Sequence, residues 1–316
     1  MTAEVVIMNK VAVAMAADSA VTVRHRDGVK IYNSAEKLFA LSHYCPVGLM
    51  IYGSAELMGM PWSTIIKLYR DQLGKRKYPA LDDYAKDFMD FLQKNAKEFF
   101  SEEHQSIYFG ATVIDFLQLL KEQAENAIKV LLEAGEQIDS QRDQVMGTII
   151  ESFHETLENK EDLQTPTSHV EAMNTKYGDG IQELINRVLN GFSIDKEHIQ
   201  QIKDMAVWLT SKNFFSDAYT GVVFAGFGEK EYFPAMAAFK VELIVNDYLK
   251  YFQDEQHKIA FDNPVVIKAF AQSEIVGMFM EGIHREYNDQ LWEYIEAIFE
   301  SYPESIVNNI PKLFIV

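Results

Sequence analysis

Val5-Val6-Ile7-Met8 and Val11-Ala12-Val13-Ala14-Met15-Ala16-Ala17 are two short apolar runs that flank the polar pair Asn9-Lys10. Two runs of strand length around a polar turn are typical of a β-hairpin. The runs are almost continuously apolar instead of alternating with polar residues, so we expect both faces of this hairpin to be buried. The N-terminal segment is therefore predicted to lie inside a layered sheet structure.

The rest of the first 56 residues continues this pattern. Further short strands are predicted at 29–32, 37–41 and 47–53, with a turn at Arg26-Asp27-Gly28. Their side chains are small, apolar and β-branched, as expected for a sheet covered on both sides.

From about residue 54 the apolar period changes from two to 3.6 residues, which is typical of amphipathic helices. These stripes continue to about residue 212 and predict six or seven helices. Ser193 is the expected N-cap of the helix that runs through Trp208.

Strands return after this helical region. They are predicted at 221–228, at 233–241 and at 258–261, and are followed by helices around 275–283 and 292–299 and by a final strand at 312–316. Strands and helices thus form separate blocks instead of alternating along the chain. This order indicates an α+β fold and argues against a doubly wound nucleotide-binding fold.

Composition restricts the partners and the compartment. The net charge of −18 repels phosphate backbones and anionic lipids, so we expect neither nucleic acid nor a membrane as a partner. No apolar run approaches the roughly 18 residues of a membrane span, and the N-terminus does not resemble a signal peptide. The single cysteine, Cys45, excludes an intrachain disulfide framework and suits a reducing compartment. We therefore expect a cytoplasmic protein.

Two Glu-x-x-His pairs, Glu151…His154 and Glu281…His284, have a spacing found in carboxylate-bridged metal sites on helices. Such a site also needs two inward-facing glutamates from partner helices, and none can be assigned. We interpret both pairs as solvated or capping residues, and we expect neither a metal nor a cofactor.

The most informative residues lie at the N-terminus. Removal of Met1 would leave Thr2 with a free α-amine, which titrates near pH 8 and can act as a base toward its own hydroxyl. Asp18, at the end of the second apolar run, can supply the negative group that orients the amine. Lys37, at the start of a predicted strand, can supply a cation that lowers the pKa of the hydroxyl.

The segment from Thr2 to Thr22 resembles the start of proteasome β-type subunits, which belong to the N-terminal-nucleophile hydrolases. In that family the catalytic aspartate lies sixteen residues after the nucleophilic threonine, and Asp18 lies sixteen residues after Thr2. Lys37-Leu38-Phe39 is similar to the strand that carries the family's catalytic lysine. The resemblance covers 2–56 well, 219–245 loosely and 265–288 weakly.

The supporting residues depart from the family pattern. The glycine whose backbone N–H forms the family's oxyanion hole is replaced by Met50 or Ile51, so the resemblance assigns the oxyanion to a backbone N–H near Met50. The family's Gly-Ser-Gly segment aligns near Ala271, with Ser273 as the nearest serine that could support the nucleophile.

The resemblance implies a four-layer αββα sandwich built from 1–56 and 213–316, with 57–212 as a helical insertion. It implies a threonine-type hydrolase of peptide or amide bonds, in which Thr2 attacks, Lys37 stabilises charge near the hydroxyl and Asp18 orients Lys37. Because family members assemble into rings, it also implies a homo-oligomer, and the insertion is a candidate for binding a partner protein. Two alternatives stay open: an inactive proteasome-like scaffold and a small-molecule amidase of the same nucleophile class.

Overall fold

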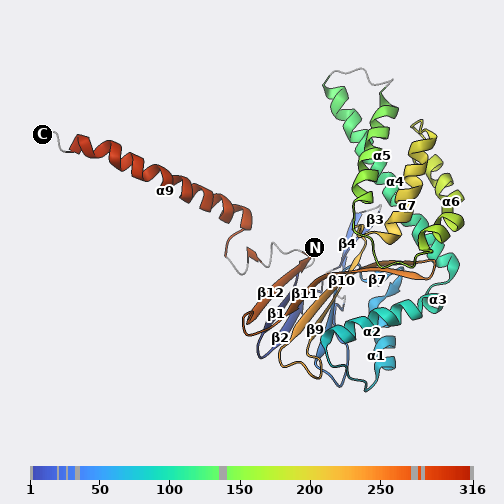
Figure 1. Ribbon diagram of the computed structural model, residues 1–316, viewed down its shortest axis with the longest axis horizontal. Coiled ribbons are helices and arrows are strands. Elements are labelled where there is room, and N and C mark those ends of the chain that lie inside the picture. The colour runs from blue at the N-terminus through green and yellow to red at the C-terminus, as the bar shows by residue number, and fades with distance from the viewer. Residues whose placement is uncertain are drawn as a thin grey trace.

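The computed structural model describes residues 3–19, 21–25, 28–32, 36–134, 141–271, 277–278 and 282–313. Within these residues the chain combines antiparallel sheets with helices that follow them in separate blocks (Figure 1). The predicted α+β class is therefore confirmed.

The N-terminal hairpin forms a three-stranded antiparallel sheet, called sheet 1 below, with β12. Its strand order is β12-β1-β2, where the strands are β1 (Ala3–Asn9), β2 (Val13–Ala17) and β12 (Val265–Ala271). Asn9 closes the hairpin turn, because its side-chain oxygen accepts the N–H groups of Val11 and Ala12 at 2.8 and 2.9 Å.

A five-stranded antiparallel sheet, called sheet 2, lies against sheet 1. Its order is β11-β10-β9-β6-β5, where the strands are β5 (Leu38–Ala40), β6 (Val47–Gly53), β9 (Thr220–Gly226), β10 (Ala235–Val245) and β11 (Tyr248–Lys258). The strand predicted at 258–261 is wrong. The observed strand, β11, is formed by the more polar stretch before this range and ends at Lys258.

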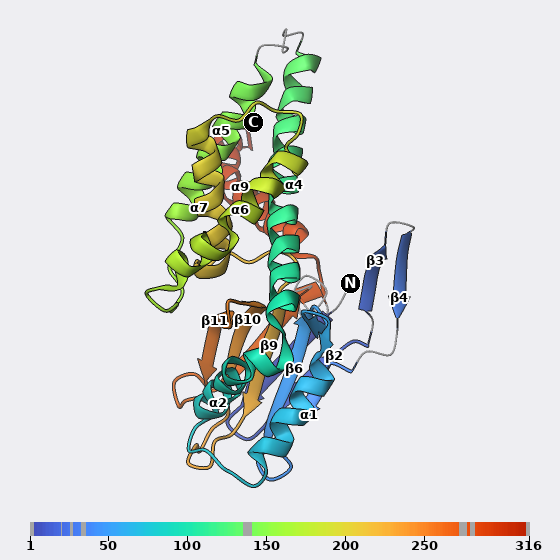
Figure 2. The same ribbon diagram turned by 90° about the vertical axis from the view of Figure 1, so that its right-hand side faces the viewer.

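Two short hairpins complete the strands. β3 (Val21–His25) and β4 (Gly28–Tyr32) form a ribbon that projects from the sandwich (Figure 2), and β7 (Glu56–Leu57) pairs with β8 (Met60–Pro61). β4 coincides with the strand predicted at 29–32.

Helices cover the other face of sheet 2. α1 (Trp62–Leu73) and α2 (Leu81–Lys94) pack their apolar sides on it (Figure 2), and the rings of Phe88 and Phe224 lie 5.5 Å apart. Val6 and Met8 of sheet 1 meet Met50 of sheet 2 in a second core between the sheets. The described residues thus form three layers: helices, sheet 2 and sheet 1.

The outer face of sheet 1 departs from the prediction of burial on both sides. Val6 and Met8, which point inward, are fully buried, whereas Ile7 between them is 40% exposed. Ile267, its partner on β12, is 44% exposed. The two-sided burial predicted from the apolar hairpin is therefore wrong for the single chain, because none of the described elements covers this face.

The described residues of 57–212 form seven helices, within the predicted number of six or seven. Besides α1 and α2 they are α3 (Ala96–Phe99), α4 (Glu102–Glu133), α5 (Arg142–Glu158), α6 (His169–Val188) and α7 (Lys196–Ser211). The last four form a bundle that stands on the sandwich (Figure 2).

The predicted N-cap of α7 is wrong by two residues. Asp195 caps this helix, because its carboxylate accepts the N–H of His198 at 2.9 Å. The N–H of Ser193 instead donates to Asp143 of α5. Both are capping residue types, so the sequence alone could not choose between the two positions.

The chain ends in a long helix, α9 (Arg285–Leu313), which extends away from the sandwich (Figure 1). The strand predicted at 312–316 is wrong for Lys312 and Leu313, which belong to α9, and 314–316 lie outside the described residues. Most of the helix predicted at 275–283 also lies outside them. Among the described helices, none combines the length and the apolar character that crossing a membrane requires.

Candidate functional site

Three charged side chains meet where β1 begins. The Nζ of Lys37 lies 2.6 Å from Oδ1 of Asp18 and 3.2 Å from Oε1 of Glu4. We call Glu4, Asp18 and Lys37 the Lys37 cluster. Asp18 and Lys37, which the sequence predicted as partners, are therefore in contact.

Backbone hydrogen bonds hold the Lys37 cluster in place. The N–H of Asp18 donates to the carbonyl of Ala3 at 3.2 Å, and the N–H of Ile51 donates to the carbonyl of Lys37 at 2.9 Å. The first bond extends the β1–β2 pairing by one residue, and the second ties Lys37 to β6. Sheet 1 and sheet 2 thus each fix one side of the ion pair.

Burial makes the cluster electrostatically unusual. Glu4 is fully buried and Lys37 nearly so, whereas Asp18 remains partly exposed. Burial raises the pKa of Glu4 above its ordinary value, and the positive charge of Lys37 opposes that rise. The second carboxylate oxygen of Glu4 is buried without a hydrogen-bond partner among the described residues.

Sequence reasoning missed Glu4. A signal was present, because Glu4 is an acidic residue beside the apolar run Val5–Met8, two positions after Thr2. A buried carboxylate requires a cationic or hydrogen-bonding partner, which Lys37 supplies here. The distance of 33 residues along the chain hid this pairing.

Thr2 and Ser273 both lie outside the described residues. Their neighbours are described: Ala3 begins β1, and Ala271 ends β12 directly opposite Ala3. Ala271 has a φ of 57°, a left-handed conformation that costs a non-glycine residue about 1 kcal/mol or more. A strained residue thus marks the end of sheet 1 at which the Lys37 cluster lies.

Met50 does not offer a free oxyanion donor in this arrangement. It lies in β6, between β5 and β9, and its side chain is fully buried in the core between the sheets. Successive amides of a central strand point to opposite neighbours. Since the N–H of Ile51 faces β5, that of Met50 faces Val223 on β9. Both amides that the resemblance suggested are therefore directed at other strands.

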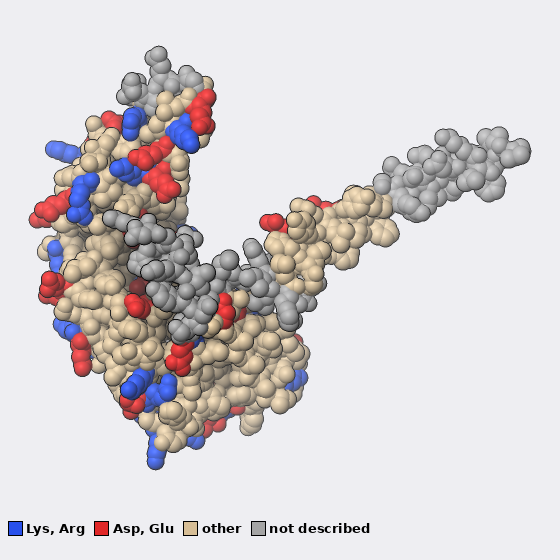
Figure 3. Space-filling model, turned by 180° about the vertical axis from the view of Figure 1, so that it is seen from behind, with Lys and Arg blue, Asp and Glu red and all other residues tan. Residues whose placement is uncertain are grey.

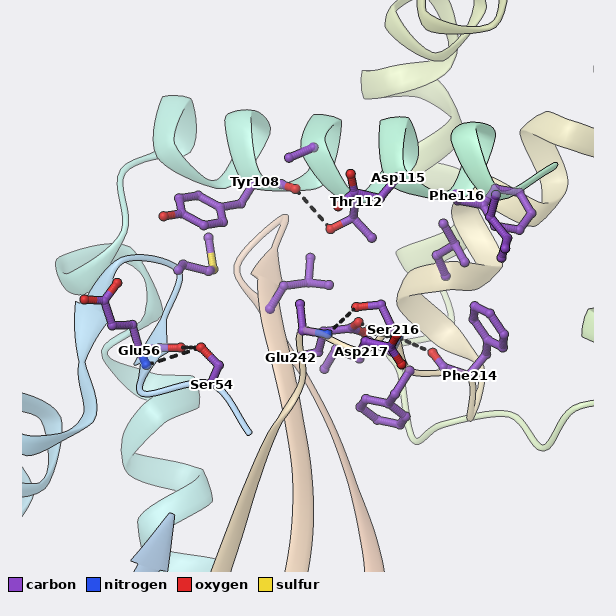
Figure 4. Close-up of a pocket in the computed structure, with 18 of the residues that line it drawn as sticks. Ser54, Glu56, Tyr108, Thr112, Asp115, Phe116, Phe214, Ser216, Asp217 and Glu242 are labelled. Carbon is purple, nitrogen blue, oxygen red and sulfur yellow. Dashed lines mark hydrogen bonds and ion pairs between the residues drawn. The ribbon is translucent and has the colours of Figure 1, made fainter. Parts of the chain in front are cut away.

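A cavity of about 750 Å3 lies elsewhere, between the helical bundle and the sandwich (Figure 4). Tyr108, Thr112 and Asp115 of α4 face it from one side, and the segment around Ser216 faces it from the other (Figure 4). None of the Lys37 cluster lines this cavity. Partial burial raises the pKa of Asp115 at its wall.

A buried ion pair forms part of the cavity floor. Nζ of Lys250 lies 2.5 Å from Oε2 of Glu242, donates to the carbonyl of Phe214 and sits 4.3 Å from the centre of the Phe215 ring. The other oxygen of Glu242 accepts the N–H of Ser216 at 2.8 Å. These contacts satisfy both charges and fasten the segment after α7 to β10 and β11, which indicates a structural role.

The Glu-x-x-His pairs do not assemble a metal site in the described part of the chain. His154 packs on Trp208 with ring centres 4.7 Å apart, and Glu151 lies 3.6 Å from a nitrogen of His198. Glu281 is outside the described residues. No group of three potential metal ligands is found within the described ranges.

No protein-family model matches this chain, and neither does any curated protein or solved structure.

Proposed function

We propose that the protein is a threonine-type N-terminal-nucleophile hydrolase that cleaves peptide or amide bonds. The contact of Lys37 with Asp18 at the start of β1 carries this proposal, because it places a cation and its orienting carboxylate next to the residue that follows Thr2. Enzymes of this kind need no cofactor, since the α-amine serves as the base.

The reaction would proceed in two steps. The α-amine of Thr2, directly or through water, takes the hydroxyl proton while Oγ bonds to the carbonyl carbon. The C–N bond then breaks, the leaving amine takes the proton, and an ester to Thr2 remains. Water hydrolyses this ester and restores the hydroxyl. Lys37 would stabilise negative charge near Oγ, and Asp18 would hold Lys37 in position.

Glu4 gives this site a feature beyond the predicted set. Thr2 precedes Glu4 by two residues, the spacing at which side chains of an extended chain lie on one side. The free oxygen of Glu4 would then be available to orient the α-ammonium of Thr2, as Asp18 orients Lys37. The oxyanion donor would have to come from outside these two positions, because the amides of Met50 and Ile51 point to β9 and β5.

We further propose that a helical layer covers sheet 1 and completes an αββα sandwich. The apolar outer face of sheet 1 supports this proposal, since such a face is normally covered by another layer.

A second candidate is an inactive scaffold of the same fold. The direction of the Met50 and Ile51 amides favours it, because a nucleophile without an oxyanion donor loses roughly a hundredfold or more in rate. In that case the helical bundle would be the functional part and would bind a partner protein.

Substitution of Thr2 separates the two candidates. Thr2→Ala should abolish hydrolysis of a panel of fluorogenic peptide amides and leave the melting temperature nearly unchanged, because the residue precedes β1. Thr2→Ser should keep part of the activity, because it retains a hydroxyl and an α-amine. Intact mass must show removal of Met1 in all three proteins. Full activity of Thr2→Ala would exclude the N-terminal mechanism.

A further inference from the structure

The outer face of sheet 1 carries only uncharged side chains, most of them aliphatic. Ile7 lies between Ala14 of β2 and Ile267 of β12, and Val5 lies between Ala16 and Ala269 in the same way. We call these six residues the apolar face. Their aliphatic side chains stand out in a chain with a net charge of −18.

The helix α9 presents a matching apolar stripe. Tyr287, Leu291, Ile295 and Phe299 recur every four residues, and Trp292 lies three residues before Ile295, which places all five on one side of the helix. Trp292 is 58% exposed and Phe299 71% exposed, although large aromatic side chains are normally buried. Figure 3 shows the projecting helix from a side on which few charged residues appear.

The dimensions of the two surfaces agree. The stripe from Tyr287 to Phe299 is about 18 Å long at 1.5 Å per residue. The strands β1 and β12 each have seven residues and are about 20 Å long. One α9 stripe can therefore cover the apolar face along its length.

We propose that α9 of one chain packs on the apolar face of a second copy, and that the exchange is reciprocal in a two-fold dimer. In the structure α9 leads away from the sandwich (Figures 1 and 3), so that its stripe does not reach the sheet of its own chain. Each chain carries one α9 stripe and one apolar face. In a two-fold dimer, each stripe would therefore cover the apolar face of the other chain. The partner's helix would be the missing layer over sheet 1.

This inference does not depend on hydrolysis, because an inactive scaffold would expose the same two surfaces. It also accounts for the sequence of the N-terminal hairpin. That hairpin is apolar on both sides, as strands covered on both faces are, yet one side is open in the single chain.

Solution mass tests the dimer. The protein should sediment at twice the chain mass of 36.2 kDa at micromolar concentration. Trp292→Glu should raise the dissociation constant by roughly tenfold or more, the effect of losing one buried aromatic anchor. Val130→Glu is the matched control, because Val130 is an equally exposed apolar residue on helix α4 and should leave the mass unchanged. A monomeric wild type would overturn the proposal.

Cross-linking tests whether α9 of a second copy covers the apolar face. In a Cys45→Ser background, Ile267→Cys marks the apolar face and Phe299→Cys marks the stripe. A flexible bismaleimide should join the two variants when they are mixed and give a covalent dimer. Three results would overturn the proposal: joining of Phe299→Cys only to itself, which indicates paired helices; joining of Ile267→Cys only to itself, which indicates paired sheets; and a monomeric cross-linked product from the chain that carries both cysteines.

Discussion

Glu4 changes what a substitution of Lys37 should do. With Asp18 as its only partner, Lys37 could be replaced by Met at little cost, because Asp18 is partly exposed to water. Glu4 is instead fully buried, so removal of Lys37 would leave its carboxylate without the cation that it contacts. The Lys37 cluster thus behaves as a buried ion pair with an additional, more exposed carboxylate.

Lys37→Met should therefore lower the free energy of unfolding by about 3–5 kcal/mol, the usual effect of breaking a buried ion pair. The double variant Glu4→Gln/Lys37→Met should recover most of this loss, because no buried charge remains. Urea unfolding of the wild type, both single variants and the double variant measures the coupling. Equal stability of Lys37→Met and the wild type would contradict the buried pairing.

His169 offers a second prediction that concerns a single residue. It is buried at the start of α6, and its Nε2 lies 3.0 Å from the hydroxyl of Thr210, which donates its own proton to Val207. With that proton on Val207, His169 donates from Nε2, and burial lowers the pKa of its imidazole, which favours the neutral form.

The sign of the pH effect follows from this lowered pKa. The unfolded chain takes up a proton below about pH 6.5, and the folded chain does so only at a lower pH. The stabilising contribution is thus present above pH 6.5 and is lost as the pH falls toward the folded pKa. Between neutral pH and about pH 5.5 the wild type should lose more unfolding free energy than His169→Gln. An equal change of unfolding free energy with pH in the two proteins would contradict a neutral buried imidazole.

At the scale of elements, the sequence predicted the strands and helices that have a clear apolar period, and it missed features set by tertiary contacts. The β1–β2 hairpin and the seven helices of 57–212 follow from local pattern. β11 is polar on one side and was missed, because only its position beside β10 makes it a strand. In the site, the contact of Asp18 with Lys37 was predictable, whereas Glu4 required the packing of sheet 1 on sheet 2.

Gly221 illustrates such a tertiary constraint. It lies opposite Tyr52 in the β6–β9 pairing, and a Cβ at this position would come within 2.0 Å of the Tyr52 ring. Gly221→Ala should therefore destabilise the protein by about 1–3 kcal/mol through overpacking. In a Tyr52→Val background the same substitution should cost much less. Thermal unfolding of the four proteins gives the coupling, and simple additivity would argue against this contact.

For the whole molecule, the arrangement of layers determines which parts can be removed. The segment 57–212 is more than an appendage, because α1 and α2 bury one face of sheet 2 against residues such as Phe224. With sheet 1 open on its outer side, the sandwich without these helices would expose apolar surface on two faces.

Deletion of 57–212 should therefore give an aggregated product, because a large exposed apolar surface drives association. Light scattering of the purified deletion variant measures this directly. A soluble, monomeric and cooperatively folded deletion variant would show that the segment is independent of the sandwich.

We propose above that Thr2 is a nucleophile activated by the Lys37 cluster. The most direct measurement is intact mass after treatment with a β-lactone, which acylates an activated hydroxyl. The wild type should lack Met1 and gain one acyl group on Thr2. Neither Thr2→Ala nor the stability-compensated Glu4→Gln/Lys37→Met variant should gain it. A wild type that has a free Thr2 amine and is never acylated would contradict the claim.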